Sequence, residues 1–156
     1  MLEVNISGRG SLSIKTLVLD YNGTLAVDGV LLDGVGEKIV QLAETLDIYV
    51  LTSDTYGSVS VQCRTLPVSV HVLESAAHTQ EKADFIAQLG RAQVVAVGNG
   101  ANDRLMLERA ALGIAVIGSE GAATAALMSS DIVVKDIRDA LGLLLNSRRL
   151  VATLRR

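Results

Sequence analysis

The sequence has few of the residues that mark disulfide-rich or nucleic-acid-binding proteins. Its 156 residues include one cysteine, one proline and no tryptophan, and aromatic residues make up 3% of the chain. The single cysteine, Cys63, excludes an internal disulfide framework and favours a reducing compartment. We interpret Cys63 as a small buried hydrophobic residue rather than a catalytic thiol. The scarcity of aromatic side chains argues against a stacking platform for single-stranded nucleic acid.

Charge and hydropathy narrow the class of protein further. The formal net charge of −3 provides no basic face for a phosphate backbone. No basic segment with an apolar run opens the chain, and no apolar stretch reaches the roughly 20 residues that span a bilayer. With 49% apolar and 20% charged residues, the composition is that of a globular protein. We expect one cytoplasmic domain, residues 1–156, that binds neither nucleic acid nor membrane.

Apolar segments with the period of strands alternate with segments that have the period of helices. The pattern predicts strands at 2–6, 12–19, 48–51, 68–72, 94–97, 114–117 and 132–134. It predicts helices at 35–46, 57–65, 79–89, 103–111, 122–128 and 136–145, with Thr79 as an N-cap and a tail that can be helical. Residues 26–32 read as a short hairpin with Asp28-Gly29 at its tip. This alternation predicts an α/β fold, a three-layer Rossmann-like domain whose mainly parallel sheet has helices on both faces.

Polar residues follow three of the predicted strands at the point where each strand ends. They are Asp20-Tyr21-Asn22-Gly23-Thr24, Thr52-Ser53-Asp54 and Gly98-Asn99-Gly100-Ala101-Asn102-Asp103. The carboxyl ends of parallel strands line the ligand crevice of such a sheet. Carboxylates, amides and backbone N–H groups can therefore meet there, and such a site can hold a hard cation and a phosphate.

Each of these residues has a chemical interpretation beside an ordinary structural one. Asp20 can attack phosphorus as a nucleophile and can also bind Mg²⁺. The Gly23-Thr24 turn can point backbone amides at phosphoryl oxygens, and Thr52 or Ser53 can donate a hydroxyl. Lys82 stands near a helix start, where a cation is disfavoured, and this suggests an anionic partner. Taken singly, they also read as a strand end, a turn, a cap and a solvated lysine.

The order of the motifs is more specific than any one of them. Asp20-x-Asn22-Gly23-Thr24, Thr52, Lys82 and Gly98-Asn99-Gly100-x-Asn102-Asp103 occur in the order of the haloacid dehalogenase-like hydrolase superfamily, which this chain resembles. Within it, the chain looks most like the phosphorylation domain of P-type ATPases. The resemblance covers nearly the whole chain except the first dozen residues and the tail.

The resemblance implies a role for each motif residue. Asp20 would be the phosphorylated nucleophile and a ligand of Mg²⁺, and the backbone carbonyl of Asn22 would also touch the metal. Thr52 would hold the phosphoryl group, and Lys82 would neutralise charge on it and on Asp20. Asn99 and Asp103 would complete the metal site. Phosphoryl transfer depends mostly on such positioning and charge neutralisation.

Three departures from the family pattern bear on activity. Family phosphatases usually have an aspartate as general acid and base where this chain has Asn22, which cannot exchange a proton in that role. Asn99 replaces an aspartate that normally binds the metal, and this removes one negative charge. Only about thirty residues separate Asp20 from Thr52. That length leaves no room for a cap or for the nucleotide-binding insertion of the pumps.

We predict a Mg²⁺-dependent phosphohydrolase that forms an aspartyl-phosphate on Asp20 and acts on a small phosphorylated substrate. Capless relatives often restrict access by oligomerising, so a homo-oligomer with a contact at 26–32 is a further expectation. A soluble ATPase-like hydrolase is the close alternative, and a phosphate-sensing or partner-binding protein that has lost turnover is another. A response-regulator receiver is disfavoured, since it needs an acidic pair on an earlier strand.

Overall fold

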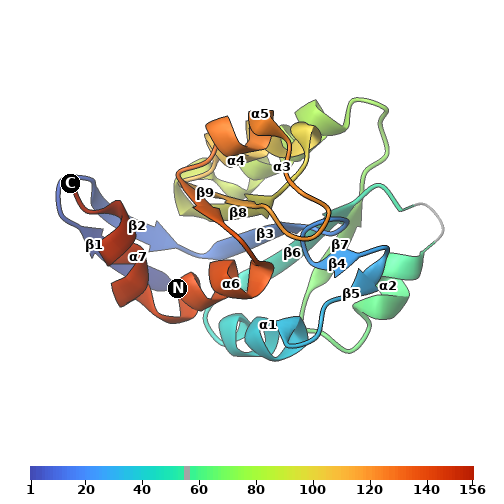
Figure 1. The fold of residues 1–156 in the computed structure, drawn as a ribbon, viewed down its shortest axis with the longest axis horizontal. Helices are drawn as coiled ribbons and strands as arrows, with labels where there is room; N and C mark the ends of the chain where they lie inside the picture. The colour runs from blue at the N-terminus through green and yellow to red at the C-terminus, as the bar shows by residue number, and fades with distance from the viewer. Residues whose placement is uncertain (55–56) are drawn as a thin grey trace.

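A parallel six-stranded sheet forms the centre of the computed structural model, which describes residues 1–54 and 57–156 (Figure 1). The strand order is β10-β9-β8-β3-β6-β7. The strands are β3 (Thr16–Asp20), β6 (Asp47–Thr52), β7 (Ser69–Val72), β8 (Val94–Gly98), β9 (Leu112–Val116) and β10 (Ile132–Val134). Every residue of the central strands β3 and β8 is buried, as expected for a sheet covered on both faces. The predicted fold class is confirmed.

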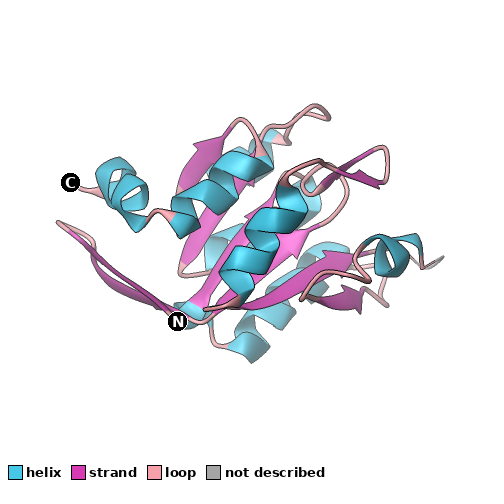
Figure 2. Cartoon of the chain, turned by 90° about the horizontal axis from the view of Figure 1, so that it is seen from below, coloured by secondary structure: helices cyan, strands magenta, loops and turns pink. Residues whose placement is uncertain are grey.

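Helices cover the two faces of this sheet (Figures 1 and 2). One face carries α1 (Val35–Ala43) and α6 (Ile137–Leu145), which pack against each other. The other carries α3 (His78–Leu89), α4 (Arg104–Arg109) and α5 (Thr124–Met128). Short elements complete the connections: α2 (Ser58–Gln62) and the 3₁₀ turns η1 (Arg91–Gln93) and η2 (Ala101–Asp103). Each face has its own apolar cluster, so the sheet separates two cores.

The path of the chain creates a topological switch point at the carboxyl ends of the strands. From β3 the chain moves outward to β6 and β7, and it then returns to β8, β9 and β10 on the other side of β3. The connections after β3 and β8 therefore leave in opposite directions. Ligands of open α/β sheets bind at such a switch point. Asp20 ends β3, and the Asn99 turn follows β8.

A hairpin follows the Asp20 turn, as predicted. It consists of β4 (Ala26–Val27) and β5 (Val30–Leu31). Asp28 and Gly29 form its tip with φ angles of 50° and 78°. The buried Tyr21 hydroxyl donates to the Gly29 carbonyl oxygen at 3.2 Å, which fixes the hairpin to the start of its own loop.

The prediction of one strand over 12–19 is wrong, because two strands share that segment. β2 (Gly10–Ile14) pairs antiparallel with β1 (Leu2–Ile6), whereas β3 begins at Thr16 in the central sheet. Lys15 separates them: its N–H donates to Gln93 and its carbonyl accepts from Asp47. An apolar pattern does not reveal which partner each half of a segment will pair with.

Helix α7 (Ser147–Leu154) covers the β1–β2 ribbon, so the tail is helical. The proposed Thr79 cap is wrong, since α3 begins one residue earlier with Ala77 at its N-cap and no side-chain cap. Cys63 is buried, as expected. Among the helices of the described residues, none has the length and apolar character needed to cross a membrane.

Candidate active site

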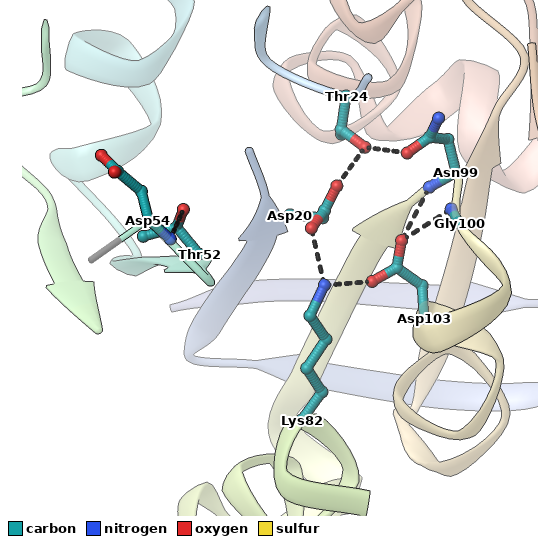
Figure 3. Close-up of polar contacts among 8 residues, drawn as sticks. All are labelled: Asp20, Thr24, Thr52, Asp54, Lys82, Asn99, Gly100 and Asp103. Atoms are coloured by element: carbon teal, nitrogen blue, oxygen red, sulfur yellow. Dashed lines mark hydrogen bonds and ion pairs between the residues drawn. The ribbon is translucent and has the colours of Figure 1, made fainter. Parts of the chain in front are cut away.

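Asp20, Lys82 and Asp103 form a buried cluster of charges beside the carboxyl ends of β3 and β8 (Figure 3). Lys82 extends from α3, and its Nζ lies 2.6 Å from Asp20 Oδ1 and 2.6 Å from Asp103 Oδ1. The Lys82 side chain is 2% exposed and that of Asp103 is 0% exposed. One ammonium group is thus shared by two carboxylates in a place that water hardly reaches. A charge pair of this kind is strongly destabilising to break, because the remaining charge stays buried.

The surroundings shift the proton affinities of this cluster. Burial raises the pKa of Asp20, and the nearby Asp103 carboxylate raises it further, while Lys82 and Thr24 lower it; the outcome is a pKa of about 7. Burial lowers the pKa of Lys82, but the two carboxylates outweigh this effect and raise it overall. Lys82 therefore carries a positive charge at neutral pH.

Oxygen atoms of three residues converge beside this cluster. The Thr24 hydroxyl lies 3.1 Å from Asp20 Oδ2 and 3.3 Å from Asn99 Oδ1, and it can donate its one proton to either. Gly23 makes the approach possible, because a Cβ on it would lie 2.4 Å from Asn99 Nδ2. Its φ of 78° is also one that favours glycine.

Asp103 organises the turn after β8. Its Oδ2 accepts hydrogen bonds from the backbone N–H groups of Asn99 at 3.0 Å and Gly100 at 2.8 Å, and its Oδ1 accepts from Lys82. Gly98 lies against it, since a Cβ there would stand 2.5 Å from Asp103 Cγ. Protein groups thus occupy both oxygens of Asp103. The side chain holds Lys82 and the turn in place.

Thr52 lies at the end of β6, the strand beside β3, and is buried. Its Oγ1 accepts from the backbone N–H of Asp54 at 3.0 Å, and in the described part of the chain its own proton has no acceptor. The Asp54 carboxylate accepts from the Ser58 hydroxyl at 2.6 Å and the Val59 N–H at 2.8 Å, so it supports the start of α2. The Thr52 hydroxyl is therefore a donor available to a ligand.

The structure brings together most of the residues that the sequence singled out. Asp20, Thr24, Lys82, Asn99 and Asp103 share one hydrogen-bonded network. The remaining candidates lie in the turns that follow β3 and β6, where Gly23 and Thr52 are buried and Asn22 and Ser53 are exposed.

Sequence reasoning missed the loop at 117–123, which connects β9 to α5. The Asn99 Nδ2 donates to the Gly121 carbonyl oxygen of this loop at 3.0 Å. Gly118 of the same loop lies close enough to Gly23 that a Cβ on it would stand 3.4 Å from the Gly23 oxygen. The two glycines at 118 and 121, both with positive φ, were the available signal.

The oxygen atoms at the site suit a hard cation that takes few ligands from the protein. Among the described residues, no group of three or more His, Cys, Asp or Glu side chains could hold a metal ion. The site offers one carboxylate oxygen, from Asp20, and one amide oxygen, from Asn99, and both face the Thr24 hydroxyl. Mg²⁺ fits such a set, because it keeps several waters and is bound by one or two carboxylates together with substrate phosphate.

Comparison with solved structures identifies the fold. The 3-deoxy-D-manno-octulosonate 8-phosphate phosphatase from Moraxella catarrhalis, solved with magnesium, phosphate and KDO, aligns with a TM-score of 0.68. The two proteins are 17% identical, and the alignment covers 91% of this chain and 94% of that one. A zinc-transporting PIB-type ATPase in the E2.Pi state aligns with a TM-score of 0.64 at 21% identity, over 79% of this chain and 20% of the pump.

The chain thus shares its fold with solved haloacid dehalogenase-like hydrolases, the fold that its motif order predicted. A curated relative is the uncharacterized protein MJ0073 of Methanocaldococcus jannaschii. It is 62% identical over 63 residues, which are 40% of this chain and 68% of that protein. No protein-family profile matches the chain.

Proposed function

We propose that the protein is a Mg²⁺-dependent phosphohydrolase that works through an aspartyl-phosphate on Asp20. The observation that carries the proposal is the shared ammonium of Lys82, 2.6 Å from both Asp20 and Asp103. A buried lysine so placed neutralises carboxylate charge and can attract a phosphoryl group, which is what phosphoryl transfer requires of a protein.

The proposed reaction has two steps. An Asp20 carboxylate oxygen forms a bond to phosphorus as the bond from phosphorus to the leaving oxygen breaks. Water then attacks phosphorus, the bond to Asp20 breaks, and phosphate leaves with the carboxylate restored. The Thr52 hydroxyl donates a hydrogen bond to a phosphoryl oxygen, and the backbone around Gly23 and Thr24 orients the group.

The proposed metal ligands are the Asp20 carboxylate, the Asn99 side-chain oxygen and the backbone carbonyl of Asn22. Bound Mg²⁺ would supply positive charge to the phosphoryl oxygens. Asp103 completes this site by holding the Asn99 turn. The network holds two carboxylates, Asp20 and Asp103, and one ammonium group, Lys82, so its total charge is −1 when all three are ionised. Bound Mg²⁺ would change the total charge of the network to +1.

The proposed substrate is a small phosphorylated compound. One solved neighbour is a 3-deoxy-D-manno-octulosonate 8-phosphate phosphatase, and another is a zinc-transporting ATPase. A soluble ATPase-like activity is therefore the second candidate. The connection from β3 to β6 holds only the hairpin and α1. We propose that the domain acts without a cap, and that the exposed Val30 of the hairpin contributes to a contact between copies.

The test is hydrolysis of p-nitrophenyl phosphate with Mg²⁺ or with a chelator. We expect turnover only with the metal, and its loss in Asp20→Asn with the fold intact by circular dichroism. Retained hydrolysis by Asp20→Asn, in protein free of contaminating phosphatase, would overturn the proposal. Saturable phosphate binding without turnover in the parent protein would favour a sensor, to which the asparagines at 22 and 99 also point.

A further inference from the structure

The loop at 117–123 is held in its middle by side chains from two other segments. Its ends are fixed by backbone: Gly118 donates to Lys135, and Ala123 donates to Asn99. Between them, the turn at Ser119 to Gly121 is exposed or half-buried. Within the described part of the chain, two side-chain hydrogen bonds join this turn to other segments, one from the Asn99 amide and one to the hairpin tip.

The first attachment is the Asn99 side chain. Its Nδ2 donates to the Gly121 oxygen at 3.0 Å, while its Oδ1 faces Thr24. Gly23 lies close to the same amide, since a Cβ on it would stand 2.4 Å from Nδ2. An aspartate here would have no N–H for the Gly121 carbonyl and would place two oxygens at hydrogen-bonding distance, which is repulsive. The amide nitrogen therefore has a function that a carboxylate cannot perform.

The second attachment is Glu120. Its Oε1 accepts a hydrogen bond from the backbone N–H of Asp28 at 3.0 Å, across 92 residues of sequence. Asp28 sits at the hairpin tip, and its neighbour Gly29 is bound by the Tyr21 hydroxyl. The tip is thus held by Tyr21 from its own loop and by Glu120 from the loop at 117–123.

We propose that Asn99 and Glu120 are positioning residues that link the active-site turn to the hairpin. The link runs from the Asn99 amide to Gly121, through Glu120, and on to Asp28. Because the hairpin directly follows the Asp20 turn, we place it at the entrance through which the leaving group departs, and this part of the inference rests on the proposed function. On this account the chain has asparagine at position 99 because its amide fastens the loop.

Hydrogen exchange of the Asp28 amide tests the link. Asn99 makes no hydrogen bond to Asp28 in the described residues, so a change at Asn99 can reach this amide only through the loop. In Glu120→Ala this amide should exchange about tenfold faster, as expected for loss of a bond to a charged acceptor. Glu120→Gln should lie between, since its amide oxygen still accepts. Ser119→Ala is the matched control, because Ser119 is exposed on the same turn and makes no side-chain hydrogen bond in the described residues. It should match the parent.

Asn99→Ala and Asn99→Asp should also speed exchange of the Asp28 amide, by roughly threefold or more, while amides of β3 and β8 keep the parent protection. Parent-like exchange of Asp28 in both variants would overturn the link, and parent-like exchange in Glu120→Ala would overturn the Glu120 attachment. If one Asn99 variant loses the protection of its β3 and β8 amides, the other Asn99 variant and Glu120→Ala decide whether the link exists.

Kinetics tests the role at the entrance. Glu120→Ala should raise KM for p-nitrophenyl phosphate about threefold or more and leave kcat within about twofold of the parent, because Glu120 does not touch the reacting atoms. An unchanged KM would overturn that role. A parent protein without any turnover would instead defeat the proposed function, and the exchange measurements would still decide the link.

Discussion

Lys82 is the residue on which the charge balance of the site depends. It is the shared partner of two buried carboxylates, so its removal leaves both without a counter-charge. We predict that Lys82→Met lowers the free energy of unfolding by about 3–5 kcal/mol. Urea denaturation measures this, with Lys15→Met as the exposed control, expected to change stability by less than about 0.5 kcal/mol.

Adding Asp103→Asn to Lys82→Met should recover part of the lost stability, because one buried charge is removed. A single Lys82→Met variant as stable as the parent would show that the carboxylates are not both ionised around the lysine.

The raised pKa of Asp20 predicts how pH and metal act together. The pKa of Asp20 is about 7 in the folded protein and 3.8 in the unfolded chain, so the folded state binds the proton more tightly. Protonation of Asp20 therefore stabilises the folded state. Metal-free stability should therefore fall as pH rises from about 4 through about 7. Mg²⁺ binds the ionised form, so its stabilising effect should be larger at about pH 8 than at about pH 6.

Thermal unfolding with and without millimolar Mg²⁺ across this range measures the effect. Asp20→Asn is the control, and it should lose most of the pH dependence of the Mg²⁺ response. A Mg²⁺-induced rise in Tm that is equal at both pH values would contradict the prediction.

Asn22 predicts the preference for leaving groups. Its side chain is exposed on the turn after Asp20 and has no proton to give as a general acid. Aryl and acyl phosphates should therefore outrun alkyl phosphates. We predict that Asn22→Asp raises kcat/KM for alkyl monoesters by roughly a hundredfold and changes aryl phosphates less. If Asn22→Asp raises kcat/KM equally for alkyl and aryl phosphates, or for neither, another group supplies the proton.

At the scale of elements, the site depends on turns that bring backbone close to side chains. Gly23 and Gly29 share a φ of 78°, but a Cβ on Gly23 would meet Asn99, whereas one on Gly29 would meet nothing within 4 Å. Each change to alanine should cost about 1–2 kcal/mol for the backbone alone. We predict that only Gly23→Ala also reduces phosphate release, by about a hundredfold or more. Comparable activities of the two variants would show that the close contact with Asn99 is not needed.

Elements that bury a regular apolar pattern were predictable from sequence, and their partners were not. The alternation of strands and helices from 48 to 145 follows from local periodicity and burial. The break at Lys15 depends on hydrogen bonds to Gln93 and Asp47, which are distant in sequence. The start of α3 at His78 was missed because no side chain caps it.

At the scale of the whole molecule, the order of strands turns separate motifs into one site. Because β3 lies between β6 and β8, the residues after these strands meet at one edge of the sheet. The motif order predicted this meeting, and it placed Asp20, Lys82 and Asp103 together. The attachments of the loop at 117–123 to Asn99 and Asp28 could not be predicted, since they depend on how two irregular segments approach each other.

The proposed mechanism requires that Asp20 is phosphorylated during turnover. Acid quenching during steady-state hydrolysis of a labelled acyl phosphate with Mg²⁺, followed by peptide mass mapping, measures it directly. We predict a phosphoryl group on Asp20 that hydroxylamine removes, and its absence in Asp20→Asn. Sustained turnover by the parent protein, with the phosphoryl group on a different residue or with label found solely in free phosphate under conditions that preserve acyl phosphates, would contradict it.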